Sequence, residues 1–169
     1  MIIIINGSVG VGKTSISWDL QKKFNKSIML DGDYIGAVYP FEIYDNKRIE
    51  YLYETFSHLI KFHYSNGYSN FIINYVFESE KSLISLTERL KKIIPEIYCF
   101  WLTCSNEVQE KRIKKRNTEG ASWELKRFIE LNNIQKLASE KGFIGNKIDT
   151  SLSSIEEITE IIWNSIIKK

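Results

Sequence analysis

The sequence has little of what a membrane-spanning, disulfide-stabilised or exported chain requires. Its 169 residues include only two cysteines, and Cys99 and Cys104 lie five positions apart in one apolar stretch. On a strand this spacing points them to opposite faces, so we expect free thiols, as suits a reducing cytosol. Apolar runs such as Ile2–Ile5 are far too short to span a bilayer. Neither the basic stretch nor the long apolar segment of a signal peptide is present, so we expect a cytoplasmic protein.

The net charge is also small. A formal charge of +2 is too small to attract nucleic acid or an anionic membrane strongly. The most basic stretch, KRIKKR at 111–116, has Glu107, Glu110 and Glu119 around it, which favours a helix face over a nucleic-acid patch. We therefore expect neither nucleic acid nor a membrane as a partner, and a monomer or homodimer.

Short apolar runs alternate with amphipathic stretches from one end of the chain to the other. Strands are expected at 2–6, 27–30, 70–77, 97–104 and within 143–151. Helices are expected at 14–24, from 46 to about 65, around 83–90, from 106 to 116, at 122–141 and after a cap at Ser153 or Ser154. This alternation predicts an α/β fold in one domain, 1–169, with a five-stranded parallel sheet between two helical layers.

The strongest motif lies behind the first apolar run. GSVGVGKT, from Gly7 to Thr14, satisfies G-x-x-x-x-G-K-[ST], with a strand expected before it and a helix after it. Such a loop curls its N–H groups around phosphate oxygens at the positive end of a helix. Lys13 is expected to contact the β- and γ-phosphates and Thr14 to ligate Mg²⁺. The expected phosphate-binding residues are Gly7, Ser8, Val9, Gly10, Val11, Gly12, Lys13, Thr14 and Ser15.

Two tetrapeptides are typical of GTP-binding switches, but their positions argue against that function. DYIG, at 33–36, begins only twenty residues beyond Lys13, which leaves little room for a switch segment. NKID, at 146–149, follows the short GFIG and not a long apolar strand. Motifs outside their structural context are weak evidence. A nucleotide-dependent switch and a nucleotide-binding module without catalysis are the two alternatives to an enzyme.

Two carboxylates favour phosphoryl transfer instead. In LDGDYIG, Asp31 and Asp33 come at the expected end of the second strand, where open α/β sheets bind their ligands. A kinase needs one carboxylate near Mg²⁺ and another that orients and deprotonates the acceptor hydroxyl. Alternation along an extended segment aims both carboxylates the same way. The competing interpretation of D-G-D is a solvated turn.

Together these motifs resemble the small P-loop kinases of the shikimate, gluconate, adenylylsulfate and adenylate kinase group, over nearly the whole chain. NGSVGVGKTS is similar to their phosphate loop and LDGD to their strand-end motif. FWLTCSNEVQEKRIKKRN resembles their fourth strand and arginine-bearing helix, and IDTSLSSIEEITEII their last strand, base-contacting turn and last helix. The resemblance implies a three-layer P-loop NTPase fold of the nucleoside-monophosphate-kinase type. It also implies ATP and Mg²⁺ as cofactors.

The resemblance further implies a role for individual residues. Asp31 would assist the metal with Thr14, and Asp33 would be the base or acceptor clamp. Arg112 would lie against adenine, and Arg116 would reach the phosphates as a short lid, 116–123, closes; Arg127 is a further candidate for that clamp. Thr150 and Ser151 would belong to the base-contacting turn. The expected catalytic residues are therefore Lys13, Asp33 and Arg116.

The acceptor site should be built mainly from residues 33–68. This segment is rich in aromatic residues, and its basic residues are Lys47, Arg48 and Lys61. Because anionic acceptors are usually held by arginine forks, this composition favours a neutral or planar acceptor. The expected substrate contacts are Asp33, Tyr34, Arg48 and Asn74, although an amide at 74 cannot act as a base.

These expectations combine into one function. The sequence predicts ATP-dependent transfer of the γ-phosphoryl group to a hydroxyl, or a phosphate, of a small molecule. Nucleosides or nucleotides, sugar acids and antibiotic-like compounds are the candidate acceptors.

Overall fold

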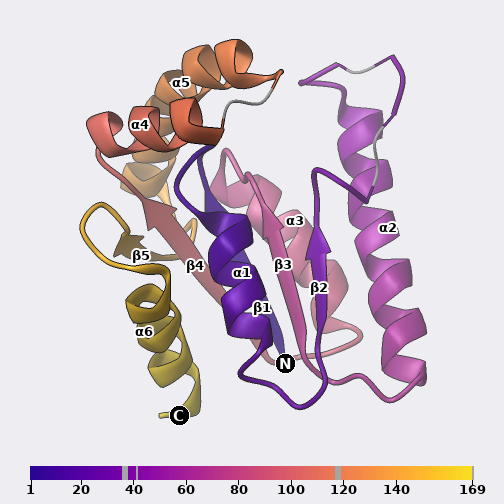
Figure 1. Cartoon of the computed structure of the whole chain (residues 1–169). Helices are drawn as coiled ribbons and strands as arrows, with labels where there is room; N and C mark the ends of the chain where they lie inside the picture. The colour runs from indigo at the N-terminus through magenta and orange to yellow at the C-terminus, as the bar shows by residue number, and fades with distance from the viewer. Residues whose placement is uncertain (36–37, 41, 117–118, 169) are drawn as a thin grey trace.

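The computed structural model describes residues 1–35, 38–40, 42–116 and 119–168, and these form three layers (Figure 1). The elements are β1 (Ile2–Gly7), α1 (Lys13–Gln21), β2 (Ile28–Asp31), α2 (Asn46–Ser65), β3 (Phe71–Tyr75), α3 (Glu80–Lys91), β4 (Ile97–Thr103), α4 (Asn106–Arg116), α5 (Ala121–Lys141), β5 (Asn146–Asp149) and α6 (Ile155–Ile167). Gly36 of DYIG and positions 117 and 118 of the expected lid lie outside the described residues.

The sheet has five strands in the order β2-β3-β1-β4-β5, and every neighbouring pair is parallel. β1 lies at the centre, where Ile4 is opposite Ile73 of β3 and Cys99 of β4. A central parallel strand is covered on both faces, which explains why its four isoleucines are fully buried. The predicted α/β class and parallel sheet are confirmed.

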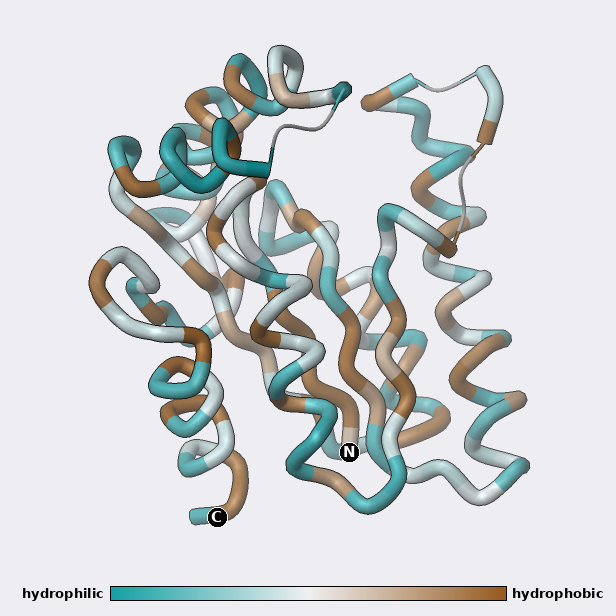
Figure 2. The backbone as a smooth tube through the Cα atoms, viewed as in Figure 1, coloured by the Kyte–Doolittle hydropathy of each residue, from teal (hydrophilic) through white to brown (hydrophobic). Residues whose placement is uncertain are grey.

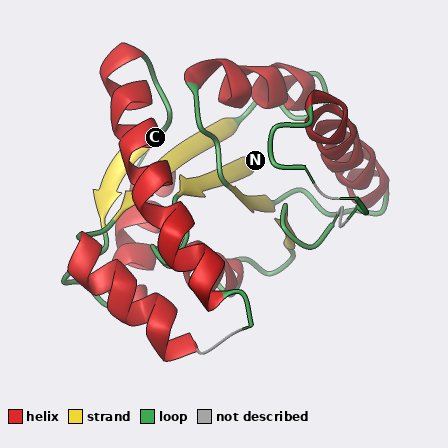
Figure 3. Ribbon diagram, turned by 90° about the horizontal axis from the view of Figure 1, so that it is seen from above, coloured by secondary structure: helices red, strands yellow, loops and turns green. Residues whose placement is uncertain are grey.

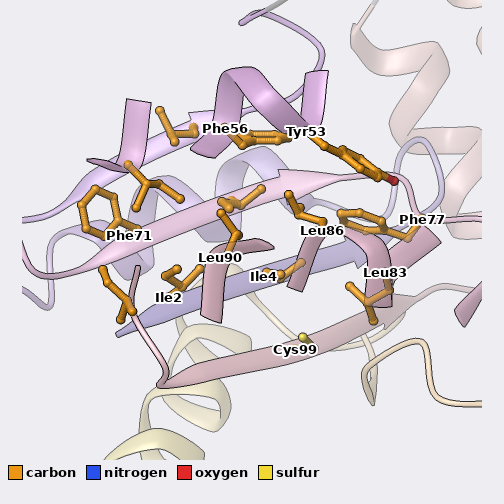
Figure 4. Packing of buried hydrophobic residues seen from close by; sticks show 14 of the residues in the cluster. Ile2, Ile4, Tyr53, Phe56, Phe71, Phe77, Leu83, Leu86, Leu90 and Cys99 are labelled. Atoms are coloured by element: carbon orange, nitrogen blue, oxygen red, sulfur yellow. The ribbon is translucent and has the colours of Figure 1, made fainter. Parts of the chain in front are cut away.

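Alternate residues of β1 serve two separate cores. Ile2 and Ile4 pack with apolar residues of α2 and α3, including Phe56 and Leu86 (Figure 4). Ile3 and Ile5 pack on the other face with α1 and α6. Cys99 belongs to the first core and Cys104 packs against the second, so the two free thiols do lie on opposite faces.

Charged and polar residues alternate with apolar ones along the helices, as Figure 2 shows. This is the pattern of helices that cover a sheet with one face and meet water with the other. Within the described residues, no helix is long and apolar enough to cross a membrane.

Several element ends differ from the predictions by a few residues. α1 stops at Gln21 and β3 at Tyr75, earlier than expected. Of the two expected caps of α6, Ser154 is the one used: its hydroxyl accepts from Glu157 N at 3.2 Å, and the Glu157 carboxylate accepts from Ser154 N at 2.8 Å.

A buried network of polar side chains joins β1 to α5. The Gln135 amide donates to Asn6 Oδ1 at 3.0 Å and to Phe77 O at 3.0 Å, and its oxygen accepts from Trp101 Nε1 at 3.2 Å. Asn6 in turn donates to Ile144 O at 2.9 Å. Five polar groups from distant parts of the chain are thus satisfied where water is excluded.

We expect Gln135→Met to lower the free energy of unfolding by about 1–3 kcal/mol, because the buried Trp101 Nε1 and Phe77 O lose the hydrogen bonds that Gln135 makes and Asn6 Oδ1 keeps only the one from Phe77 N. Urea denaturation measures the change. Lys136→Met, at the next, exposed position of the same helix, is the control and should stay near wild type. Equal stability of the two variants would contradict the structural importance of this network.

Candidate active site

A cavity of about 1,090 Å³ lies at the carboxyl edge of the sheet. Figure 3 looks down on this edge, toward which the strands point. The loops after β1, β2 and β3 meet α4, α5 and the start of α6 around it. The volume is at the upper end for single ligand sites, so it suits two ligands side by side. This edge is where open α/β sheets bind their ligands.

The loop between β1 and α1 forms one wall of this cavity. Gly10 (φ +81°) and Gly12 (φ +101°) adopt left-handed conformations that other residues rarely tolerate. Among the described residues, no side chain caps the N-terminus of α1. The N–H groups of its first turn are therefore available to an anion, at the positive end of the helix dipole. The predicted phosphate loop has the geometry that its motif requires.

Lys13 lies at the bottom of this loop. Its Nζ donates to Ser8 O at 3.1 Å, and the side chain is largely buried. Burial lowers the pKa of Lys13, while the nearby carboxylates of Asp33 and Asp31 counteract that change in part. A compact ammonium beside the N–H groups of the loop is suited to bind a polyphosphate.

Asp31 is held in place beside Thr14. The Thr14 hydroxyl donates to Asp31 Oδ2 at 3.1 Å, and Asp31 Oδ1 accepts from Asp33 N at 3.0 Å. A hydroxyl and a carboxylate are oxygen ligands of the kind that Mg²⁺ prefers. Over the described part of the chain, no three His, Cys, Asp or Glu residues gather as a metal site. The Thr14 hydroxyl and the Asp31 carboxylate fit as two of the oxygen ligands of such an ion.

Asp33 lines the cavity two residues further on. Its side chain is exposed within the open cavity. Partial removal from water by the surrounding protein raises its pKa, Lys13 lowers the pKa in part, and Asp31 raises it further. The preceding Gly32 is required by a close contact, since a Cβ there would lie 2.4 Å from the Tyr75 ring. A carboxylate with a raised pKa on the cavity wall is suited to accept a proton.

Arg112 links three segments at the other end of the cavity. Its guanidinium donates to Thr150 Oγ1 at 3.0 Å and to Thr150 O at 2.7 Å, and Thr150 Oγ1 donates to Val11 O at 2.9 Å. Both Arg112 and Thr150 line the cavity, as their expected nucleotide roles require.

Ser151 does not share this position. Its hydroxyl donates to Asp149 and accepts from Ser105 N at 2.8 Å, and it is not among the described residues that line the cavity. The turn directs Ser151 toward Ser105, in the loop after β4, and Asp149 holds it there by accepting from Ser151 N at 2.8 Å. Ser153 and Ser154 line the cavity instead.

Arg116 lies where α4 ends. Its Nη2 is 3.2 Å from Glu124 Oε2 of α5, and both residues line the cavity together with Trp123. The arginine is partly exposed, and the described ends of the expected lid, Arg116 and Trp123, therefore border the site.

Two of the expected substrate residues are placed elsewhere by the backbone. Tyr34 is 82% exposed and lies outside the described cavity lining, because the chain turns at Asp31, whose carbonyl accepts from the N–H of 34. Asn74 is only 1% exposed, lies opposite Asp31 in the sheet, and places its Nδ2 3.8 Å from Met29 Sδ. Alternation along β3 turns Asn74 away from the cavity and turns its neighbour Tyr75 toward it.

Three residues of the site were not predicted, or only weakly. Gln109 is buried and donates to Ser8 Oγ at 3.1 Å and to Val9 O, which fixes α4 against the phosphate loop. Glu78 and Arg127 form an ion pair that lines the cavity. A lone Gln on a charged helix carries no sequence signal, and the Glu78–Arg127 pair spans 49 positions.

The fold is that of known small kinases. No protein-family model matches the sequence, and no curated protein matches it. A sugar kinase from Janibacter sp. HTCC2649 superposes with a TM-score of 0.71 at 15% identity, covering 99% of this chain and 94% of that one. Deoxyadenosine kinase from M. mycoides (TM-score 0.61, 18% identity, 100% of both chains) and shikimate kinase from Acinetobacter baumannii (0.60, 16%, 99% of this chain and 93% of that chain) also match. The expected three-layer α/β fold is confirmed, and these solved kinases share it.

Proposed function

We propose that the protein is an ATP-dependent phosphotransferase that moves the γ-phosphoryl group to a hydroxyl of a small molecule. One observation carries the proposal most directly. Lys13 and Thr14 of the phosphate loop and the carboxylate of Asp33 border one cavity, which extends well beyond the loop, and Thr14 is hydrogen-bonded to Asp31 directly behind the cavity wall. A cavity for two ligands with a carboxylate between them is what transfer between two molecules requires.

The proposed chemistry uses groups of this chain in defined roles. Asp33 orients the acceptor hydroxyl and takes its proton as the hydroxyl oxygen forms a bond to the γ-phosphorus. The bond from that phosphorus to the β–γ bridging oxygen breaks, and ADP leaves with the electron pair. Lys13 and the N–H groups of the loop hold the phosphates, and Arg116 stabilises charge on the transferred group.

Mg²⁺ fits the pair of Thr14 and Asp31 in this proposal. Held by these two residues, the ion would supply positive charge that offsets the negative charge of the phosphates. The adenine end of the nucleotide would lie between Arg112, Thr150 and the residues that begin α6.

The GTP-binding switch is a weaker proposal. NKID forms β5, and none of its four residues is among the described residues that line the cavity. Asp149, which would have to contact guanine in a switch, instead accepts hydrogen bonds from Ser151. A nucleotide-binding module without catalysis would differ from the kinase in one measurable property: only the kinase would show turnover that depends on an acceptor.

An acceptor panel with ATP and Mg²⁺, read by ADP release above the background with water alone, tests the proposed function. The kinase requires that ADP release rise with the concentration of at least one hydroxyl compound. Hydrolysis of GTP in preference to ATP, with no dependence on any acceptor, would support the switch and contradict the kinase.

The pH dependence should show two limbs set by Asp33 and Lys13. Transfer needs Asp33 deprotonated and Lys13 protonated, and their pKa values are respectively raised from 3.8 and lowered from 10.5. We therefore expect kcat/KM to rise through the raised pKa, level off, and fall through the lowered one, in a window narrower on both sides than 3.8–10.5. An acid limb that persists unchanged in Asp33→Asn would contradict this assignment.

A further inference from the structure

Part of the cavity lies beyond Asp33, away from the phosphate loop, and we call it the acceptor half. Its walls come from the segment before α2, from α2 itself and from the end of β3. Much of this surface is apolar or aromatic: Val38, Ile43, Ile49, Tyr53, Tyr75 and Val76. Four charged side chains also line it: Asp33, Arg48, Glu78 and Arg127. Whether the two arginines are already paired with groups of the protein decides which acceptors this half can hold.

Arg127 is already balanced by protein carboxylates. Its side chain is only 6% exposed, and its guanidinium pairs with Glu78 and with Glu130. Nη1 also donates to the Tyr44 hydroxyl at 3.1 Å, and the guanidinium lies 5.6 Å from the centre of the Tyr44 ring. Two carboxylates around one buried guanidinium leave the cluster with a net negative charge. An anionic ligand would have to displace Glu78 to reach Arg127.

Arg48 is engaged differently, but it is also committed to the protein. Nε donates to Glu42 O at 3.1 Å and Nη2 to Ile43 O at 2.9 Å, which fixes the segment before α2. Burial raises the pKa of Tyr75, and a hydrogen bond with Arg48 counteracts that rise. Arg48 also lies near Asp33, whose carboxylate it favours electrostatically. The Arg48 guanidinium thus fixes the segment before α2 and places its positive charge near Asp33, the proposed base.

We propose that the acceptor is an uncharged alcohol with an aromatic or other apolar body, and this rests on the proposed function. A second anion in the acceptor half would face Asp33 and Glu78 while finding both arginines occupied by protein groups. A neutral ligand avoids that repulsion and gains from covering the apolar wall, at about 25 cal/mol for each Å² removed from water. The charged residues here shape the site and exclude anions.

Matched pairs of acceptors that differ in charge test this inference by turnover. We choose shikimate and its methyl ester, gluconate and glucitol, and 5-carboxy-2′-deoxyuridine and its 5-carboxamide. In each pair that supports ADP release, the neutral member should have a kcat/KM at least about tenfold higher. A preference for the anionic member would overturn the inference. Absence of acceptor-dependent ADP release across this and the wider panel would count against the proposed function instead.

A binding experiment with inorganic sulfate tests the inference without turnover. Crystals of the wild type and of Glu78→Gln, each saturated with a non-hydrolysable ATP analogue and Mg²⁺, are soaked in the same sulfate concentrations. We expect sulfate on Arg127 only in Glu78→Gln, with at least about tenfold tighter binding in solution than in the wild type. Glu88→Gln, an exposed change on α3, is the control and should match the wild type. Sulfate on Arg48 or Arg127 of the wild type, or none in Glu78→Gln, would overturn the inference.

Discussion

Asp33→Asn should leave ATP binding intact and lower the rate of phosphoryl transfer by about 10²–10⁴-fold, the usual contribution of a positioned general base. Asparagine has nearly the same shape but accepts no proton at neutral pH. The substitution also removes a negative charge near Lys13, so affinity for the nucleotide should not fall. Single-turnover measurement of product formation, with ATP affinity measured separately by calorimetry, distinguishes the two effects.

A matched control for this substitution is Asp19→Asn, on the far part of α1, where the carboxylate pairs with the exposed Lys22. It removes the same charge and should behave as the wild type, because surface ion pairs contribute little. Near-normal transfer by Asp33→Asn would remove Asp33 from its proposed role, whereas loss of ATP binding would reassign it to the nucleotide.

Lys13→Ala should abolish measurable turnover, with a loss of at least about 10³-fold in kcat/KM. The lysine is the buried cation of the phosphate loop, and its ammonium is fixed by Ser8 O at 3.1 Å. Without it, the backbone dipoles, the proposed Mg²⁺ and Arg116 still oppose phosphate charge, but the buried ammonium of the loop is lost. ATP affinity should fall along with the rate, in contrast to Asp33→Asn.

Lys22→Ala provides the matched control on the same helix. Lys22 caps the carboxyl end of α1 and its side chain is 76% exposed. It should retain wild-type turnover and stability. If Lys13→Ala kept both ATP affinity and turnover, the phosphate loop would not be the nucleotide site.

The fold could be predicted from the sequence because its signals are local and periodic. The four consecutive isoleucines of β1 and the alternation of short apolar runs with amphipathic helices predicted a parallel sheet covered on both faces. The phosphate loop could be predicted in detail because its motif fixes conformation residue by residue, as at Gly10 and Gly12. Asp31 ends β2 as expected, but residues 32–35 form a turn, so the extended alternation that would aim Asp31 and Asp33 the same way is wrong: Asp31 is buried and Asp33 lines the cavity.

The acceptor side could not be predicted to the same depth, because its contacts join distant segments. Arg127 meets Tyr44 across 83 positions and Glu78 across 49, and no periodicity links these residues. The placement of Asn74 depended on which face of β3 the side chain occupies, and its neighbour Tyr75 reaches the cavity instead. The position of Tyr34 outside the cavity results from a turn, in which the carbonyl of Asp31 accepts from the N–H groups of residues 34 and 35.

The arrangement of the two bound molecules is the most direct measurement. A crystal structure with a non-hydrolysable ATP analogue and Mg²⁺ should place the analogue's phosphates in the loop from Gly7 to Thr14. The Asp33 carboxylate should then face the γ-phosphate across a gap that one hydroxyl group fills. Phosphates bound elsewhere, or Asp33 turned to bulk solvent away from them, would contradict transfer by this site.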